Sequence, residues 1–296
     1  MKEPSQIVDA HVHVWSANTD RYPLAPGFKK SDLWQPSFTP ETYFQYSQSV
    51  EKVRLNLVQM TWYGLNHSYI LDLIADDPET FVGTSIVPAI TDVSLPSPEK
   101  TMVALAQGGI YAFRIRGGKT ARQPIGNPTR WLDHPGYEQM FQTGAQHNLA
   151  LSFLMGTNDL PELDRMCTQF PETPVISDHV CGIRSQNGIL PESELELLYC
   201  MAKHNRVMVK LGPFQALGNG RPPYLDLLPL IRGIVDAFGP ERCMWESDSG
   251  GPIVMKDPTK DYPLSIALVQ DQANFLSNSD KKQILSKTAE DFFFNR

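Results

Sequence analysis

The 296-residue chain has few cysteines, no long apolar run and no excess of positive charge. Its four cysteines lie far apart and form no C-x-x-C pair, which excludes a zinc knuckle or a disulfide framework and predicts reduced thiols. No run of about 18 apolar residues exists, so we expect no association with a membrane. The net charge of −7 argues against a non-specific nucleic-acid binder, which needs basic stripes.

Three further signals are missing from the sequence. No G-x-G-x-x-G follows the first apolar run, so a dinucleotide-binding fold has no support. No apolar signal region precedes Ile7, which together with the scattered thiols predicts a cytoplasmic protein. Internal repeats and low-complexity stretches do not stand out. What is present is a globular composition, with 41% hydrophobic and 20% charged residues, which excludes an intrinsically disordered chain.

Short apolar runs alternate with amphipathic segments along the whole chain. The apolar runs are rich in Val, Ile and Phe and are bounded by turn residues, which predicts buried strands at 7–14, 53–60, 81–87, 110–115, 149–155, 174–180, 207–211 and 243–245. The segments between and after them predict helices at 41–51, 66–75, 99–107, 137–146, 159–168, 192–203, 224–237, 262–276 and 280–294.

Eight strands that alternate with helices indicate a parallel sheet. At this length a closed (β/α)8 TIM barrel is the economical arrangement, as one domain over residues 1–296, and an open doubly wound sheet is the alternative. The predicted helix-to-strand connections are short, whereas several strand-to-helix loops are long and rich in proline. Because the latter loops gather at one end of a barrel, where active sites lie, the sequence predicts a site at that end.

The segment Asp9-Ala10-His11-Val12-His13 carries two histidines on the first predicted strand. Strand alternation places Asp9, His11 and His13 on one face, with Val12 on the other. Two imidazoles that point into a barrel are metal ligands or proton-handling groups, and the alternative is a pair of hydrogen-bonded interior histidines.

Two other predicted strands end in polar residues. His179 ends the sixth strand, and alternation places its neighbour Asp178 on the side of the helices. Asp248 ends the eighth strand and shares an inward face with Glu246. An aspartate at the carboxyl end of a barrel strand is typical of a catalytic residue, and the alternative is a helix N-cap.

Several basic residues are candidates for binding a substrate anion. Arg114 and Arg116 share the inward face of the fourth strand, Lys210 faces inward on the seventh, and Arg122 and Arg184 lie in the loops after the fourth and sixth strands. For Arg114 the alternative is an interior ion pair. Because unpaired buried charges are costly, we expect Glu246 to contact Lys210 or Arg114. The loop aromatics, among them Trp15 and Trp34, either line a substrate pocket or anchor the loops.

These residues, in this order, resemble the amidohydrolase superfamily, and more narrowly the amidohydrolase-2 family. The resemblance covers nearly the whole chain, and the matching segments are 9–15, 112–114, 174–179, 209–211 and 242–248. The chain is most similar to the branch of lactone hydrolases that includes 2-pyrone-4,6-dicarboxylate lactonase and the sugar-acid lactonases. It departs from the family pattern at Glu246, where Gly is usual, and at Ser249, where Trp is usual.

The resemblance implies a hydrolase that opens a lactone or related cyclic ester of a small carboxylic or sugar acid. Asp248 would act as general base, while His11, His13 and His179 polarise the carbonyl or position the water. The same four residues would be the ligands of any metal. Because the predicted fifth strand offers no imidazole or carboxylate, a two-metal site is not expected. One divalent ion, zinc or manganese, and no ion both stay open.

Two other functions stay open at this point. One is a metal-dependent non-oxidative decarboxylase of an aromatic or muconate-type acid, which the wider family contains. The other is a catalytically idle barrel that binds a ligand. In each case the expected partner is a small molecule, and the oligomeric state, a homo-oligomer included, is open.

Overall fold

Eight parallel strands form the centre of the molecule. The computed structural model describes residues 6–118, 128–186 and 188–296. Each strand pairs in parallel with the next one along the chain. The strands are β1 (Gln6–His13), β2 (Lys52–Val58), β3 (Phe81–Ser85), β4 (Ile110–Arg116), β5 (Ala150–Leu154), β6 (Val175–Ser177), β7 (Val207–Leu211) and β8 (Cys243–Trp245).

The first and last strands meet and close the barrel. Val12 forms a parallel bridge with Ser249, just beyond β8, and the His13 amide donates a hydrogen bond to the Ser249 carbonyl over 2.8 Å. The predicted (β/α)8 TIM barrel is therefore confirmed. Among the described residues, no helix is long and apolar enough to cross a membrane.

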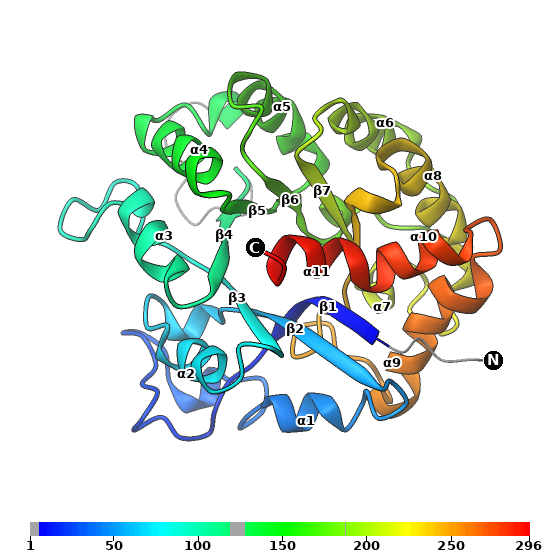
Figure 1. Ribbon diagram of the computed structural model, residues 1–296, viewed down its shortest axis with the longest axis horizontal. Coiled ribbons are helices and arrows are strands. Elements are labelled where there is room, and N and C mark those ends of the chain that lie inside the picture. Colours follow the sequence, from blue (N-terminus) through cyan, green and yellow to red (C-terminus); the bar gives the residue numbers. More distant parts are fainter. Residues whose placement is uncertain (1–5, 119–127, 187) are drawn as a thin grey trace.

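The helices surround the strands (Figure 1). They are α1 (Pro40–Phe44), α2 (Ser68–Asp76), α3 (Pro98–Ala106), α4 (Pro135–His147), α5 (Leu160–Gln169), α6 (Glu192–Cys200), α7 (Phe214–Leu217), α8 (Leu228–Phe238), α9 (Pro258–Ala267), α10 (Asn278–Lys282) and α11 (Thr288–Phe293). Their apolar faces pack on the outer side of the strands, as in α8, where Ile231, Ile234 and Phe238 are buried.

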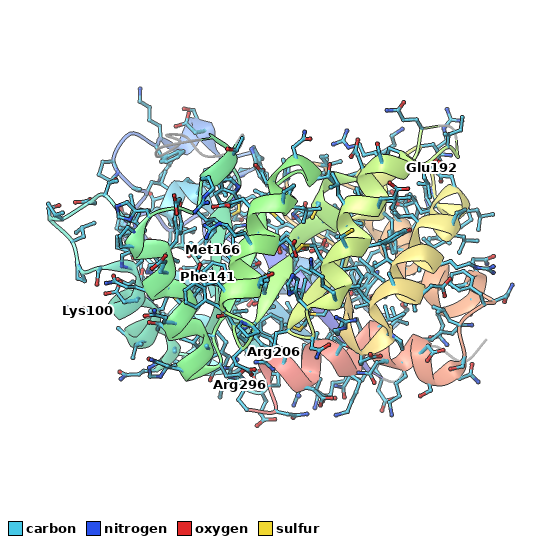
Figure 2. All side chains as sticks on the ribbon, turned by 90° about the horizontal axis from the view of Figure 1, so that it is seen from above. Lys100, Phe141, Met166, Glu192, Arg206 and Arg296 are labelled. Carbon is cyan, nitrogen blue, oxygen red and sulfur yellow. The ribbon has the colours of Figure 1, made fainter. Side chains whose placement is uncertain are left out.

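The last helix closes one end of the barrel. Ala289 and Phe293 of α11 pack against a small apolar cluster inside the barrel, which includes Val8, Ala112 and Met244. Figure 1 shows α11 lying across the strands, and Figure 2, turned by 90°, places Arg296 at this end and Glu192 of α6 at the other. The polar residues of the strand ends are therefore left to the opposite opening, where the long loops lie.

Candidate active site

A bulge in β1 turns its two histidines into the barrel. The register with β2 shifts between Asp9 and Val12, and a bulge places one extra residue in a strand. Before the bulge Val8 and Ala10 join the interior cluster, while Asp9 points outward and accepts a hydrogen bond from the Tyr43 hydroxyl of α1 over 2.9 Å. The predicted shared face is therefore wrong for Asp9, because simple alternation does not hold through a bulge.

His11 and His13 lie side by side at the inner surface. Their Nε2 atoms are 3.2 Å apart, and His13 Nδ1 lies 2.8 Å from the Val58 carbonyl oxygen. Since a carbonyl only accepts, Nδ1 of His13 carries the proton and its Nε2 presents a lone pair to the site. Burial lowers the pKa of His13 to about 3 and that of His11 well below its usual value, so both rings are neutral.

The chain leaves β6 through a left-handed turn. His179, Val180 and Cys181 have φ values of 55°, 52° and 53°, a conformation that L-residues rarely adopt. The turn directs both Asp178 and His179 into the barrel opening. The prediction that Asp178 faces the helices is therefore wrong, because alternation ends where β6 ends at Ser177.

Asp178 pairs with Lys210 and Arg114. Its carboxylate lies 2.9 Å from Lys210 Nζ and 3.2 Å from Arg114 Nε, and it accepts a hydrogen bond from Ser152 of β5 over 2.9 Å. Burial alone would raise the pKa of Asp178, but Lys210 and Arg114 outweigh that effect and hold it well below its usual value. Asp178 is therefore an ionised counter-ion that fixes Arg114 and Lys210 in place.

Glu246 pairs with histidines. Its Oε1 lies 2.7 Å from His179 Nδ1, and its Oε2 lies 3.2 Å from His11 Nδ1. No ion pair within 4.0 Å joins Glu246 to Lys210 or Arg114 in the described part of the chain, so the predicted pairing is wrong. Asp178 takes those cations instead.

The Glu246 carboxylate also sets the state of His179. Burial alone lowers the pKa of this imidazole, but Glu246 and then Asp248 outweigh it and raise the pKa above its usual value. The Nε2 atom of His179 lies 3.3 Å from an Arg114 terminal nitrogen and faces the opening. His179 is thus the most basic of the three imidazoles.

Asp248 stands above the histidine pair. Its Oδ1 lies 3.4 Å from His13 Nε2 and 3.8 Å from His11 Nε2. Among the described residues this oxygen has no hydrogen-bond partner, and burial raises the pKa of the carboxyl to about 6. Asp248 has a φ of 51°, so the backbone after β8, like that after β6, is left-handed where it presents a polar side chain.

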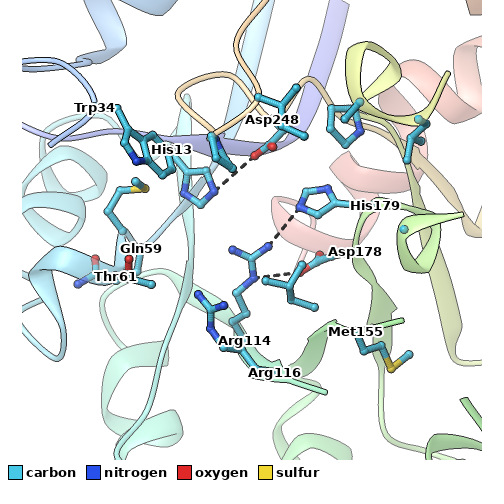
Figure 3. Close-up of a pocket in the computed structure, with 18 of the residues that line it drawn as sticks. His13, Trp34, Gln59, Thr61, Arg114, Arg116, Met155, Asp178, His179 and Asp248 are labelled. Atoms are coloured by element: carbon cyan, nitrogen blue, oxygen red, sulfur yellow. Dashed lines mark hydrogen bonds and ion pairs between the residues drawn. The ribbon is translucent and has the colours of Figure 1, made fainter. Parts of the chain in front are cut away.

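These groups open into a cavity of about 350 Å³. His13, His179, Asp248 and Arg114 line it, and Figure 3 shows their side chains pointing toward one another. Of the other predicted binding residues, Arg116 and Arg184 also line the cavity. Lys210 is fully buried behind the histidines, and Arg122 lies outside the described residues.

Other lining residues had no clear signal in the sequence. Gln59, Thr61 and Met155 follow directly or closely after β2 and β5 and line the same cavity. Their place after a strand end is the only feature that could have pointed to them. Asp178 had a stronger signal, because it precedes His179 at a strand end.

The residues present fit one divalent ion. His11 Nε2 and His13 Nε2 are 3.2 Å apart, and Asp248 Oδ1 lies 3.4 Å from His13 Nε2 and 3.8 Å from His11 Nε2. Two ligand atoms that each lie about 2.1 Å from a zinc ion at a tetrahedral angle are about 3.4 Å apart, which is close to these distances. The unpartnered Asp248 Oδ1 is the kind of buried oxygen that an ion would satisfy. A second set, His11, His179 and Glu246, is as close together, but Arg114 lies within 3.4 Å of Nε2 on both of its imidazoles, whereas in the first set it lies beside His11 alone.

A family model described as Amidohydrolase matches residues 8–294. Among curated proteins, an L-fucono-1,5-lactonase from Burkholderia ambifaria is 25% identical over 258 residues, which cover 81% of this chain and 79% of that protein. A 4-sulfomuconolactone hydrolase from Hydrogenophaga intermedia is 23% identical over 241 residues, which cover 81% of this chain and 73% of that protein.

Solved structures share the fold at low identity. A probable 2-pyrone-4,6-dicarboxylic acid hydrolase from Acinetobacter baumannii, with citric acid bound, matches with a TM-score of 0.73 and 17% identity, over 97% of this chain and 98% of that one. An amidohydrolase from Burkholderia multivorans with bound zinc matches with a TM-score of 0.73 and 15% identity, over 97% of this chain and 99% of that one. A 2,6-dihydroxybenzoate decarboxylase matches less well, with a TM-score of 0.61 and 12% identity, over 98% and 99%.

Proposed function

The chain belongs to the amidohydrolase family, and from this premise we propose that it hydrolyses a lactone or related cyclic ester of a small carboxylic or sugar acid. Two curated relatives that act on lactones, each aligned over 81% of the chain, support this reaction. The observation that carries the proposal is Asp248, a carboxylate that lines the cavity, has an unpartnered oxygen and lies beside two neutral histidines.

Asp248 is the general base of the proposed mechanism. With its pKa raised to about 6 by burial, the carboxylate is ionised at neutral pH yet basic enough to take a proton from water. The water oxygen then bonds to the lactone carbonyl carbon, and the ring carbon–oxygen bond breaks from the tetrahedral intermediate. The proton returns from Asp248 to the leaving oxygen, so the product is an open hydroxy acid.

The Arg114 guanidinium, with His179 beside it, stabilises the negative charge that develops on the carbonyl oxygen. Arg114 and His179 both line the cavity, and their nitrogen atoms lie 3.3 Å apart. Asp178 fixes the guanidinium, and Glu246 holds the imidazole by its other nitrogen over 2.7 Å. Donors held in place before the reaction need little rearrangement in the transition state, which is how an oxyanion is stabilised most effectively.

A divalent ion is compatible with this arrangement, and His11, His13 and Asp248 would hold it. When bound, it would polarise the carbonyl or lower the pKa of the attacking water. The zinc bound in the related fold from Burkholderia multivorans supports a divalent ion in this chain, though not a particular ligand set. The chain's own residues keep the same tasks: His13 is oriented by the Val58 carbonyl, and Lys210 Nζ lies 3.1 Å from Nδ1 of His11.

An acid group on the substrate would bind to the arginines of the cavity. Arg116 and Arg184 come from β4 and from the loop after β6, and both line the wall beyond Arg114. Guanidinium groups bind carboxylates through paired hydrogen bonds. We therefore place the acid end of the substrate beside Arg116 and Arg184. Arg122, which lies outside the described residues, is a further candidate for binding this acid group. Lys210 would contribute only its positive charge, from behind the histidines.

A panel of sugar lactones and pyrone carboxylates tests the proposed function. Hydrolysis releases acid, which a pH indicator detects, and Asp248→Asn run in parallel distinguishes this site from a contaminating esterase. Turnover of at least one lactone that the variant loses is the expected result. Release of carbon dioxide from an aromatic acid, with every lactone left intact, would instead identify the decarboxylase.

A further inference from the structure

A second cavity lies next to the first at Asp248. It has a volume of about 270 Å³, and its lining includes residues from the loops after β1 and β8. Trp34, Asp248 and Ile253 line both cavities, so the two meet at these three side chains. A molecule whose reacting carbon lies beside Asp248 therefore has two directions in which to extend.

Four aromatic side chains contribute to the walls of the second cavity. Trp15 and Phe38 are buried, with ring centroids 5.7 Å apart, and Tyr46 packs on Phe38 at 6.0 Å. The ring of Trp34 is perpendicular to that of Trp15, with ring centroids 6.1 Å apart. Trp34 is 51% exposed, so much of its ring is accessible to a ligand. Aromatic rings in such edge-to-face and tilted arrangements offer flat surfaces to another ring. Both cavities also have polar residues: the first contains three arginines and two acids, and the second contains Gln35, Gln215, Asp248 and Ser249.

Some polar atoms around the second cavity are already bonded within the protein. Trp15 Nε1 donates to the Gln35 carbonyl over 2.9 Å, and Gln215 Nε2 donates to the Ser247 carbonyl over 3.0 Å. The Ser249 hydroxyl accepts from Ser247 over 2.8 Å. Gln215 Oε1 and Asp248 Oδ1 lack a partner in the described part of the chain, and both residues line this cavity. The four aromatic side chains and Ile253 are the surfaces that an apolar ring of a ligand would contact.

We propose that the second cavity binds a flat apolar substituent, such as an aryl ring, on the lactone that this enzyme opens. The inference rests on the proposed function and names the substrate class: an amphipathic lactone with its acid end at the arginines and its ring substituent against Trp34, Trp15 and Phe38. The volume is sufficient, since an apolar cavity of about 150 Å³ binds benzene.

The test compares two lactone acids that differ only in a phenyl or a methyl substituent on the lactone ring. The wild type should prefer the phenyl compound in kcat/KM, and Trp34→Ala should reduce the phenyl-to-methyl ratio about tenfold through lost apolar contact. Because Trp34 also lines the first cavity, the ratio is the readout. Leu225→Ala is the matched control, since Leu225 is also half exposed and lines neither cavity.

Failure of this inference can be told apart from failure of the proposed function. If methyl and phenyl lactones are opened equally well, or the ratio is the same in Trp34→Ala and wild type, the lactonase stands and the subsite is refuted. If no lactone is opened, calorimetry with the phenyl-bearing hydroxy acid decides: binding that Trp34→Ala weakens about tenfold, and Leu225→Ala does not, supports the subsite, and equal or absent binding overturns it.

Discussion

The three carboxylates of the site differ in what they contact, and that difference assigns their tasks. Asp178 faces Lys210 and Arg114, and its pKa is held low, so it cannot act as a base. Glu246 holds His179 Nδ1 with its Oε1; its buried Oε2 lies near His11 without a hydrogen-bond partner among the described residues, and Glu246 does not line the cavity. Only Asp248 combines a raised pKa with an unpartnered oxygen on the cavity wall, as far as the described residues go. Environment rather than residue type therefore selects the base.

Asp248→Asn should lower kcat by about 10²- to 10⁴-fold, the usual contribution of a general base. The substitution should not lower the free energy of unfolding. Because the pKa is raised, the ionised carboxylate is less favourable in the folded than in the unfolded protein. Ionisation of Asp248 therefore lowers the free energy of unfolding as the pH rises from about 4 to about 6. The variant should therefore melt at a higher temperature than the wild type at pH 8, with the difference fading toward pH 4. Retained turnover would contradict the assignment, and Asp20→Asn, at an exposed site, is the control.

The pH profile of kcat/KM follows from the same carboxyl group. A base works only when ionised, so activity should be present at neutral pH and fall tenfold per pH unit below about pH 6. The acid limb should be missing from the residual activity of Asp248→Asn. A wild-type limb near pH 4, the ordinary value for aspartate, would show that burial does not govern this group.

At the scale of the secondary-structure elements, strand alternation was a good guide where strands are regular. On β4 it placed Arg114 inward, and directly after β8 it placed Glu246 inward, as the structure shows. It failed for Asp9, because a bulge interrupts β1, and for Asp178, because a left-handed turn follows β6. A bulge and a run of positive φ at non-glycine residues depend on contacts distant in the sequence, so local patterns do not reveal them.

The loop after β8 should be intolerant of added bulk at Gly251. A Cβ built there would lie 2.4 Å from Asp248 Oδ2, and the residue is buried, so Gly251→Ala must displace the carboxylate. A displacement of about 1 Å can cost about 10²-fold in rate, and we expect a loss of that order in kcat/KM. Gly156→Ala in the loop after β5 is the matched control, since nothing lies within 4 Å of its Cβ. Equal activity of the two variants would show that the position of Asp248 is not critical.

At the scale of the whole molecule, the barrel was predictable because alternating strands and helices of this number have few ways to bury both faces of a parallel sheet. The convergence of His11, His13, His179 and Asp248 followed from their common place at strand ends. The ion pairs behind them did not follow, since Lys210 and Arg114 had two carboxylates within plausible reach. Which carboxylate each cation meets depends on the turn after β6, a tertiary detail.

Metal binding should be visible in the stability of the whole barrel. An ion held by His11, His13 and Asp248 links β1 to the end of β8, the seam where the barrel closes, and binds only the folded chain. Zinc or manganese at about 100 times its dissociation constant would then add about 2.7 kcal/mol, a rise of roughly 5 °C in melting temperature. His13→Gln should abolish the rise, because an amide replaces the imidazole lone pair, whereas His147→Gln, on the surface at the end of α4, should retain it.

Scanning calorimetry of chelator-treated wild type and both variants, with and without the ion, gives the melting temperatures that test this expectation. A rise that persists in His13→Gln would place the ion elsewhere, and no rise in the wild type would leave proton transfer and charge stabilisation to Asp248, His179 and Arg114.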